Sequence, residues 1–215
     1  MEEPRKEFSP EEIASIVREN EALREENAGL KERLTYDSNT GLLRTEDEGR
    51  QTILRKIETI HGQGKKVCLL RLDVNGLKDL NEASSHEEVD EIFFPDLGKR
   101  LLELTGEQDG VAMRYHGDEL GILVPLDDVS DMTKADSLVH RLDNFYVKTP
   151  GGEKRFTFTI GIAHEDEPEV KEKIGKLDNK EGELSEEGNL FTALCKVADQ
   201  RERQAERKKK KERNG

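Results

Sequence analysis

The sequence predicts an α+β fold, in which a central antiparallel sheet is flanked by helices and preceded by a coiled-coil helix. Two kinds of periodicity support this: short apolar segments that alternate with a period of two, and longer segments with apolar residues every three or four positions. After the first helix, the predicted order is helix, strand, helix, hairpin, helix, strand and helix. That order is typical of a split βαβ arrangement, with helices on one or both faces of the sheet.

The first segment, residues 9–34, has the heptad pattern of a coiled coil. Ser9 and Glu12 have the spacing of a capping box, and Pro10 suits the first helical position. Acidic g positions precede basic e positions by five residues, as in ion pairs between parallel strands. We therefore predict a parallel coiled-coil homodimer, and the alternative is a single solvent-exposed helix. The core positions are Ile13, Asn20, Asn27 and Leu34 at a, and Ile16, Leu23 and Leu30 at d.

Chain length and charge limit the class of protein. The 215 residues suggest one domain with an appendage. With 35 basic and 48 acidic residues the formal charge is −13, so a nucleic acid is not expected as a partner. Apolar segments fall well short of the ~20 residues that cross a bilayer, so no membrane partner is expected. Cys68 and Cys195 lie in apolar surroundings and are expected to be reduced core residues of a cytoplasmic protein.

The remaining elements are predicted from apolar periodicity and from turn residues. Pro95 lies inside one predicted helix and indicates an irregularity there. Residues 165–188 are acidic and contain glycine, so we expect a loop or an insertion. The predicted helices are 46–60, 77–81, 87–104, 131–146 and 189–207; the predicted strands are 67–73 and 156–163, with a hairpin across 110–124.

These elements divide the chain into three regions. A coiled-coil helix covers residues 1–34, a globular domain covers 35–207, and a basic tail covers 208–215. The basic residues from Arg201 to Arg213 suggest, as an alternative, a surface for RNA or another acidic partner. We favour a solvent-exposed helix end, because basic residues there also complement the helix dipole.

Two adjacent acidic residues, Asp118 and Glu119, follow Gly117 at the tip of the predicted hairpin. Two adjacent carboxylates repel each other and favour a bound cation. The strand at 67–73 ends on a third carboxylate, Asp73. If this strand pairs with the hairpin, Asp73 and Asp118 are able to share a metal ion, because hard cations prefer oxygen ligands.

Five segments resemble, in order and in spacing, motifs of the GGDEF domain family of diguanylate cyclases, which join two GTP molecules into cyclic di-GMP. The resemblance extends from Asp37 to about Ala205 and implies a palm-like central antiparallel sheet of the nucleotidyl-cyclase kind. Residues 37–42 resemble DxLTGL, 72–81 resemble LDIDxFKxIN, 86–90 share the His and the final Asp of GHxxGD, 116–120 take the place of GGDEF, and 159–163 resemble SIGVA.

The resemblance implies a diguanylate cyclase that uses Mg²⁺ or Mn²⁺. Asp73 and Asp118 are then metal carboxylates, and the carbonyl of Val74 is a further ligand. Glu119 is expected either to bind a second metal ion or to help activate the 3′-hydroxyl. The implied catalytic residues are therefore Asp73, Asp118 and Glu119. Two cations supply both the positive charge and the activated hydroxyl that phosphoryl transfer needs.

The resemblance also implies which residues bind GTP. Lys78 is expected to hold phosphate as a point charge. Asn81 and Asp90 are expected to read the guanine edge, and a carboxylate suits guanine because N1–H and N2–H₂ are both donors. His116 and Gly117 occupy the signature position at which glycines let the backbone approach the substrate.

Taken singly, these residues have structural interpretations. Asp73 is able to cap the following helix. Lys78 and Asn81 fit a solvated helix face, His86 fits a structural role, and Asp90 lies in an acid-rich run that is ordinarily exposed. Their common order along the chain favours a nucleotide-and-metal site instead.

The sequence departs from the family pattern near the expected site. His116 replaces the first glycine of the signature, Asn75 replaces an Asp, and Ser85 and Val89 replace the two glycines of GHxxGD. A β-carbon and an imidazole at His116 oppose close approach of a ligand.

Two further departures lie elsewhere. The phosphate-holding Lys of the family's last helix falls at Glu206 or at Arg201, depending on the alignment. The inhibitory-site motif RxxD falls at residues 107–110, which read Glu-Gln-Asp-Gly, so no inhibitory site is expected. Two hypotheses follow: an active cyclase, in which the coil brings two GTP-bound domains together, or a degenerate domain that binds GTP or a related nucleotide and signals without turnover.

Overall fold

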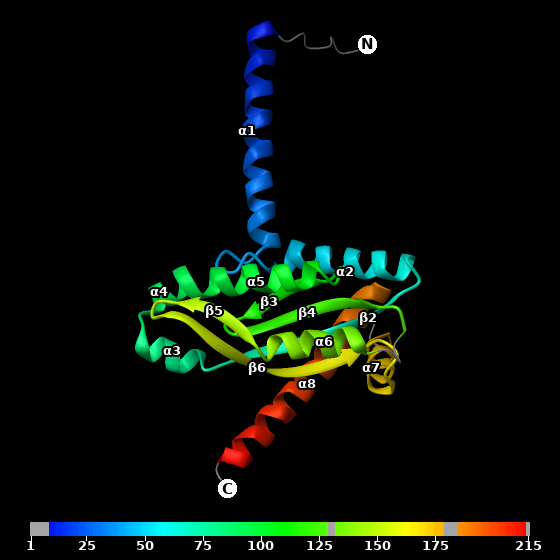
Figure 1. The fold of residues 1–215 in the computed structure, drawn as a ribbon. Helices are drawn as coiled ribbons and strands as arrows, with labels where there is room; N and C mark the ends of the chain where they lie inside the picture. Colours follow the sequence, from blue (N-terminus) through cyan, green and yellow to red (C-terminus); the bar gives the residue numbers. More distant parts are fainter. Residues whose placement is uncertain (1–8, 129–131, 179–184, 214–215) are drawn as a thin grey trace.

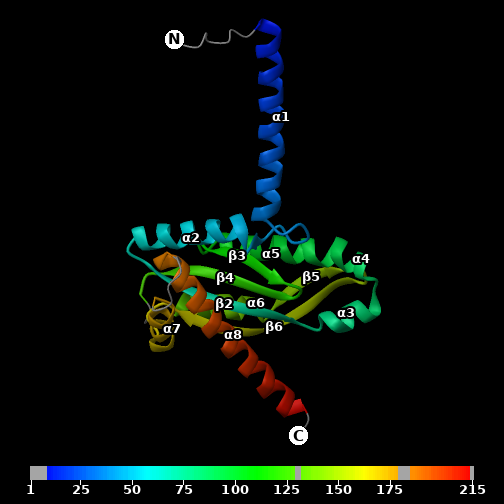
Figure 2. The ribbon, with the colours of Figure 1, turned by 180° about the vertical axis from the view of Figure 1, so that it is seen from behind.

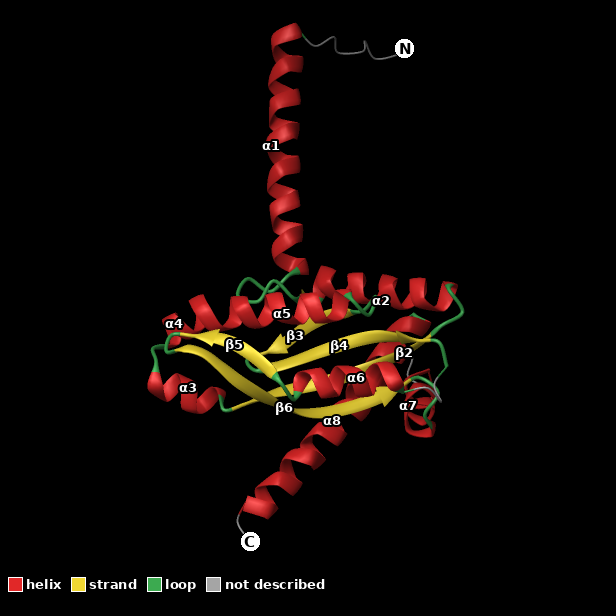
Figure 3. Cartoon of the chain, viewed as in Figure 1, coloured by secondary structure: helices red, strands yellow, loops and turns green. Residues whose placement is uncertain are grey.

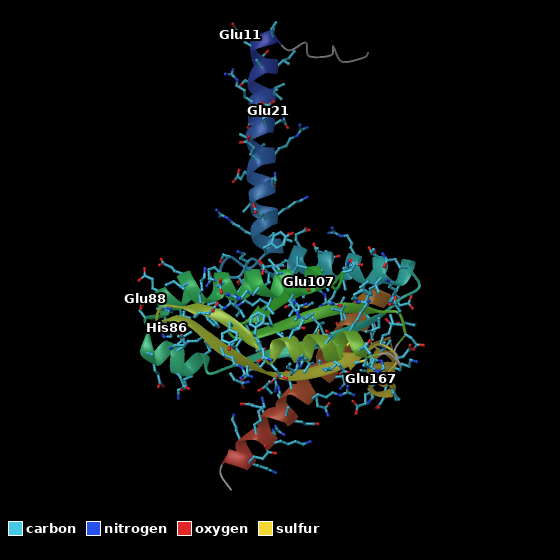
Figure 4. All side chains as sticks on the ribbon, viewed as in Figure 1. Glu11, Glu21, His86, Glu88, Glu107 and Glu167 are labelled. Atoms are coloured by element: carbon cyan, nitrogen blue, oxygen red, sulfur yellow. The ribbon has the colours of Figure 1, made fainter. Side chains whose placement is uncertain are left out.

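The computed structural model describes residues 9–128, 132–178 and 185–213 of the chain. A long helix, α1 (Pro10–Thr35), stands away from a domain in which helices pack on a sheet (Figure 1). The capping box predicted at its start is present, because the Ser9 hydroxyl accepts from Glu12 N–H and the Glu12 carboxylate accepts from Ser9 N–H. Glu11 and Glu21 are labelled along this isolated helix in Figure 4.

The apolar positions of α1 face solvent. Ile13 is 51% exposed, and Leu23 and Leu30 are each 48% exposed. The helix is therefore consistent with a coiled-coil segment whose apolar stripe lies uncovered in the single chain. The dimer itself stays a prediction.

The domain is built on a mixed, curled sheet of six strands in the order β1-β3-β4-β2-β6-β5. The neighbouring strands are antiparallel, apart from the short edge strand β1, which is parallel to β3. The α+β fold with a central sheet and a preceding long helix is confirmed. The strands are β1 (Leu43–Arg44), β2 (Lys66–Asn75), β3 (Val111–His116), β4 (Glu119–Leu126), β5 (Phe145–Thr149) and β6 (Gly152–His164).

Helices cover both faces of this sheet, and each face has its own apolar core (Figure 3). One core includes residues of α3, α5 and α6, and the other includes residues of α2, α7 and α8. Alternation along β2 divides its side chains between the two cores. The helices of the domain are α2 (Asp47–Gly62), α3 (Leu77–Ala83), α4 (His86–Glu88), α5 (Phe94–Gly106), α6 (Thr133–Leu142), α7 (Pro168–Asp178) and α8 (Glu186–Arg213).

The irregularity expected at Pro95 is present. The predicted helix 87–104 is divided into α4, a π-helical turn η1 (Val89–Phe93) and α5, and Pro95 lies in the first turn of α5. Proline has no N–H to donate to the preceding turn, so the irregular turn falls directly before it.

Two predicted segments differ from the structure. The helix expected over 131–146 ends at Leu142, and its expected start at Asp131 lies outside the described residues. Residues 145–149 instead form β5, which pairs with β6 along its whole length. Every second residue of β5 is buried. Aromatic and β-branched residues favour a strand at this position. The loop expected at 165–188 contains α7, because Val170 is buried and Ile174 and Leu177 pack against the same core.

The last helix is also longer than expected. Helix α8 begins at Glu186 and continues to Arg213, so it includes the first residues of the predicted basic tail. It crosses one face of the sheet and then projects beyond it, as the view from behind makes clear (Figure 2). Cys68 is buried and Cys195 is half-buried, and both are free thiols.

Candidate nucleotide and metal site

The register of β2 places four polar side chains on one face of the sheet. Asp73 lies opposite Glu119 on β4 and opposite Thr159 on β6. Residues directly opposite in an antiparallel pair project to the same face, so these side chains lie together. Arg71, two residues earlier in β2, projects to this face as well. The strand that ends on Asp73 does pair with the hairpin, which was the condition for a shared metal site.

The tip of the hairpin brings a second carboxylate to Asp73. Gly117 has a φ of +54°, a backbone conformation that glycine adopts without strain. Asp118 follows it in the turn between β3 and β4, and it lines the same cavity as Asp73. This juxtaposition agrees with the shared site expected from the sequence.

The cavity has a volume of about 610 Å³ and lies between the end of β2, the start of α3, the hairpin tip and the last turns of α8. Of the residues predicted for the site, Asp73, Val74, Lys78 and Asp118 line it together. The complete lining is Asp73, Val74, Asn75, Gly76, Leu77, Lys78, Asp118, Thr157, Thr159, Glu206, Lys209, Lys210 and Glu212.

The charge in this cavity is unbalanced. Burial, together with the carboxylates of Asp118, Glu206 and Glu119, raises the pKa of Asp73 to about 6. In the described part of the chain, the Asp73 and Asp118 carboxylates have no hydrogen bond or ion pair. Two unpaired carboxylates are hard oxygen donors of the kind that Mg²⁺ and Mn²⁺ prefer. The residues present therefore fit a divalent cation.

Protein ligands alone would leave such a cation incompletely coordinated. The described residues contain no group of three or more His, Cys, Asp and Glu side chains placed to hold a metal ion. Asp73, Asp118 and the Val74 carbonyl would supply part of the coordination, and phosphate oxygens or water would supply the rest. This is the usual way in which Mg²⁺ is held at nucleotide sites.

Lys209 and Lys210 line the cavity. Both were predicted to lie in a basic tail, but they belong to the last turns of α8. Lys209 Nζ donates to Thr159 Oγ1 at 3.2 Å and to the Phe158 carbonyl at 3.4 Å. Lys210 forms an ion pair with Glu206. If the helix had been predicted to continue past residue 207, its spacing would have placed Lys209 and Lys210 next to Glu206 on the same helix face.

Arg71 is a second residue that the sequence analysis missed. It is 7% exposed and pairs with Glu119, and its Nε lies 3.5 Å from both Asp199 Oδ1 and Glu202 Oε2. Its guanidinium carbon lies 4.2 Å from the centre of the Tyr115 ring. The signal in the sequence was an arginine inside an otherwise apolar strand, which rarely occurs without a buried partner.

Helix α8 brings a further buried carboxylate to the site. Glu202 is 5% exposed, and burial raises its pKa to about 7, with Asp73 adding to the shift and Arg71 opposing it. The helix passes this close because Gly161 lies beneath it. A β-carbon on Gly161 would lie 2.0 Å from the Ala198 carbonyl oxygen and 2.5 Å from the Glu202 amide nitrogen.

The residues predicted to read the base lie outside the cavity lining. Asn81 is on α3, and its Oδ1 is buried without a hydrogen-bond partner in the described residues. Asp90 is exposed on η1, and His86 lies at the start of α4 (Figure 4). His116 and Gly117 also lie outside this lining, and the His116 side chain is 78% exposed.

The junction after α1 is tied to the hairpin tip. Arg114 donates to Asp37 Oδ1 at 2.8 Å and, through Nε and a terminal nitrogen, to the Gly117 carbonyl at 3.0 and 2.8 Å. Burial acts to raise the pKa of Asp37, but hydrogen bonds from Arg114 and Thr40 outweigh it, so this pKa lies below its ordinary value. Arg114 also lies over the Phe94 ring, 4.1 Å from its centre.

The residues at the position of the inhibitory motif are engaged with basic partners. Glu107, labelled in Figure 4, pairs with Arg141 at 2.5 Å, and Asp109 pairs with Lys56 at 2.6 Å. This segment therefore carries the acidic side chains of Glu107 and Asp109, whereas the motif begins with a basic Arg. The absence of an inhibitory site stays a prediction.

A comparison with protein families identifies the domain. The family model described as "Diguanylate cyclase, GGDEF domain" matches residues 35–212. This match covers most of the chain, and it includes the lysines of α8 that line the cavity. The chain belongs to the GGDEF domain family. A search of curated proteins found no match.

Solved structures of GGDEF domains share the fold. The coiled coil and GGDEF domain of DgcB from Caulobacter crescentus, in complex with c-di-GMP, aligns with a TM-score of 0.63 and 18% identity over 91% of this chain and 92% of that one. Diguanylate cyclase SiaD of Pseudomonas aeruginosa, in complex with its activator SiaC, aligns with a TM-score of 0.56 and 20% identity over 92% and 68%. The GGDEF domain of YfiN from P. aeruginosa gives 0.58 and 20% over 80% and 89%.

No membrane span is present among the helices that the structure describes, since each is too short or too polar to cross a bilayer.

Proposed function

We propose that this protein is a diguanylate cyclase that converts two GTP molecules to cyclic di-GMP across a homodimer, with Mg²⁺ or Mn²⁺ as cofactor. The observation that carries the proposal is the shared cavity of Asp73 and Asp118, whose carboxylates are unpaired, with Lys209 and Lys210 on its wall. The family membership and the DxLTGL-like junction after a long helix support it.

Each group at the site has a distinct task in this proposal. Asp73, Asp118 and the Val74 carbonyl hold the cation, which when bound offsets the charge of the triphosphate. Lys209 and Lys210 hold phosphate oxygens from the α8 side, and Lys78 does so from the start of α3. These lysines replace the single last-helix Lys whose family position is occupied here by Glu206 or Arg201.

The reaction needs two copies of the chain, because each domain holds one GTP and the product joins both. The uncovered apolar stripe of α1 is the surface proposed to bring them together. A coil of about three and a half heptads with Asn20 and Asn27 at a positions favours a specific dimer of modest stability.

A second candidate function is a degenerate GGDEF domain that binds GTP or a related nucleotide without turnover. Two observations favour it. His116 carries an imidazole where the signature has its first glycine. Glu206 adds a carboxylate to the cavity and contributes to the raised pKa of Asp73, which opposes binding of a triphosphate.

One experiment separates these functions. The full chain is incubated with GTP and Mg²⁺, and the products are identified by chromatography and mass. Cyclic di-GMP formed by the parent and by the surface control Asp109→Asn, but not by Asp118→Asn, supports the cyclase. GTP binding without any cyclic product supports the degenerate domain. A chain that neither binds nor converts GTP contradicts both.

The dimer is tested by substitutions in the coil. Leu23→Glu with Leu30→Glu places charge at two d positions, so we expect dissociation to monomers and a turnover per chain about tenfold lower that rises more steeply with protein concentration. GTP binding per chain should stay the same, since α1 packs mainly against α2 and β1, which lie outside the cavity lining. Sedimentation and a rate-versus-concentration series measure both effects.

The matched control adds the same charge away from the seam. Ala22→Glu with Ala28→Glu should leave assembly and turnover like the parent. A monomeric Leu23→Glu, Leu30→Glu protein with full activity per chain would overturn the dimer mechanism.

Base choice provides another test. If Asn81 and Asp90 accept from guanine donors, GTP should bind better than ATP by about 1–3 kcal/mol, roughly 5- to 150-fold. Asp90→Ala should reduce this preference, whereas Glu91→Ala, one residue along the same turn, should keep it. Calorimetry with both nucleotides measures the ratio, and equal affinity of the parent for GTP and ATP would remove these residues from the site.

A further inference from the structure

We propose that Arg71 is a positioning residue of the nucleotide site, which holds the Glu119 carboxylate so that the metal ion is bound by Asp73 and Asp118 while Glu119 stays beside it. The inference rests on the proposed function. It concerns a residue that lies outside the matched motifs, and it chooses between the two roles expected for Glu119.

The sheet makes room for Arg71 with two glycines. In the register of the sheet, Arg71 lies opposite Gly121 on β4 and opposite Gly161 on β6. Neither neighbour has a side chain, so the guanidinium is able to lie flat between the sheet and α8. The α8 backbone closes the space from above, since a β-carbon on Gly161 would collide with the Ala198 carbonyl.

Groups on several sides fix the guanidinium. It stacks on the Tyr115 ring, and the Tyr115 hydroxyl is itself hydrogen-bonded to Cys195 Sγ at 3.2 Å. Asp199 and Glu202 of α8 lie on another side, each 3.5 Å from Nε. A buried Arg held by stacking and by carboxylates presents its remaining donors in one direction. That direction is toward Glu119.

The contacts of Glu119 differ from those of the other two carboxylates. Arg71 binds its Oε2, and His116 Nε2 lies 3.2 Å from the same oxygen. A metal ion would have to displace the guanidinium to use that oxygen. Asp73 and Asp118 require no such displacement, because they have no partner in the described residues. The three carboxylates therefore divide into a metal-binding pair and one that is held by the protein.

The positive charge of Arg71 is also expected to act on the pair. Asp73 is two residues away on the same face, and Arg71 is the buried cation among Glu119, Asp199 and Glu202. Removing the charge while keeping a polar side chain, as in Arg71→Gln, makes the site more negative and frees Glu119. A divalent cation should then bind more tightly and a triphosphate less tightly. A general loss of structure would weaken both.

The test measures binding to the full chain and needs no turnover. Mn²⁺ binding to the nucleotide-free protein is followed by electron paramagnetic resonance, and GTP binding in Mg²⁺ is followed by calorimetry. For Arg71→Gln we expect Mn²⁺ affinity to rise about tenfold and GTP affinity to fall about tenfold. Arg71→Lys keeps the charge, so its Mn²⁺ affinity should match the parent. Arg100→Gln, which removes an Arg from the surface pair with Glu153, should change neither affinity.

Unchanged affinities in a folded Arg71→Gln protein, or a parallel loss of both, would overturn the proposal. If that variant does not fold, the coupling of Arg71→Lys with Glu119→Gln is measured instead. Lysine keeps the charge but loses the forked and stacked contacts, so Arg71→Lys should weaken GTP binding. Its loss and that of Glu119→Gln should be less than additive in the double variant, and additive losses would overturn the proposal. A chain without cyclase activity still gives these affinities, so the failure of the proposed reaction is seen separately.

Discussion

Replacing Asp118 by Asn is expected to weaken Mg²⁺-dependent GTP binding by at least ~100-fold and to abolish formation of cyclic di-GMP. The change keeps the shape of the side chain and removes one of the two carboxylates proposed to hold the cation. Loss of a partner beyond the direct ligands already costs ~10–100-fold in metal affinity, so loss of a direct ligand should cost more. Calorimetry with GTP, in the presence of Mg²⁺ and then of a chelator, measures the effect.

The matched control is Asp109→Asn. Asp109 has a positive φ, which Asn tolerates, and it pairs with Lys56 at the other end of β3. It should keep the Mg²⁺ dependence of the parent. If Asp118→Asn binds GTP with an unchanged dependence on Mg²⁺, the assignment of the metal pair is wrong.

Gly161→Ala is expected to destabilise the domain by ~3 kcal/mol or more, because the new methyl group meets the α8 backbone instead of a flexible side chain. The helix must move away from β6 to make room. Lys209 and Lys210 lie further along the same helix, so the folded fraction should also bind GTP more weakly. Urea unfolding gives the first effect, and calorimetry below the unfolding midpoint gives the second.

Gly106→Ala provides the comparison. Gly106 ends α5, is exposed, and has no atom within 4 Å of the position of an added β-carbon. Alanine there should change the free energy of unfolding by less than ~1 kcal/mol. A Gly161→Ala protein as stable as this control would mean that α8 does not pack on the sheet in the way described.

The sequence predicted the parts of the fold that local pattern determines. The capping box of α1, the strand β2, the hairpin and the irregularity before Pro95 all come from residues close together in the chain. Strand β5 and helix α7 were missed for a physical reason. Each is short, and its burial pattern becomes meaningful only when a partner, β6 for one and α8 for the other, is already in place.

The same distinction applies to the candidate site. Asp73 and Asp118 were predicted together because strand pairing alone places them side by side. Arg71, Lys209 and Lys210 were missed because their roles depend on the path of α8 across the sheet. That path depends on close packing at Gly161. A sequence pattern does not reveal how closely a helix packs on the sheet that it crosses.

Arg114 ties the junction after α1 to the turn between β3 and β4, so the two are expected to behave as one cooperative unit. Its side chain donates to Asp37, directly after the helix, and to the carbonyl of Gly117, directly before Asp118. By thermodynamic linkage, free energy gained by ordering the turn around a ligand is shared with the junction, and the coupling is equal in the reverse direction. If a rotation of the coil draws Asp37 away from Arg114, the affinity of the turn for its ligand therefore falls by some factor. The bound ligand disfavours that rotation by the same factor.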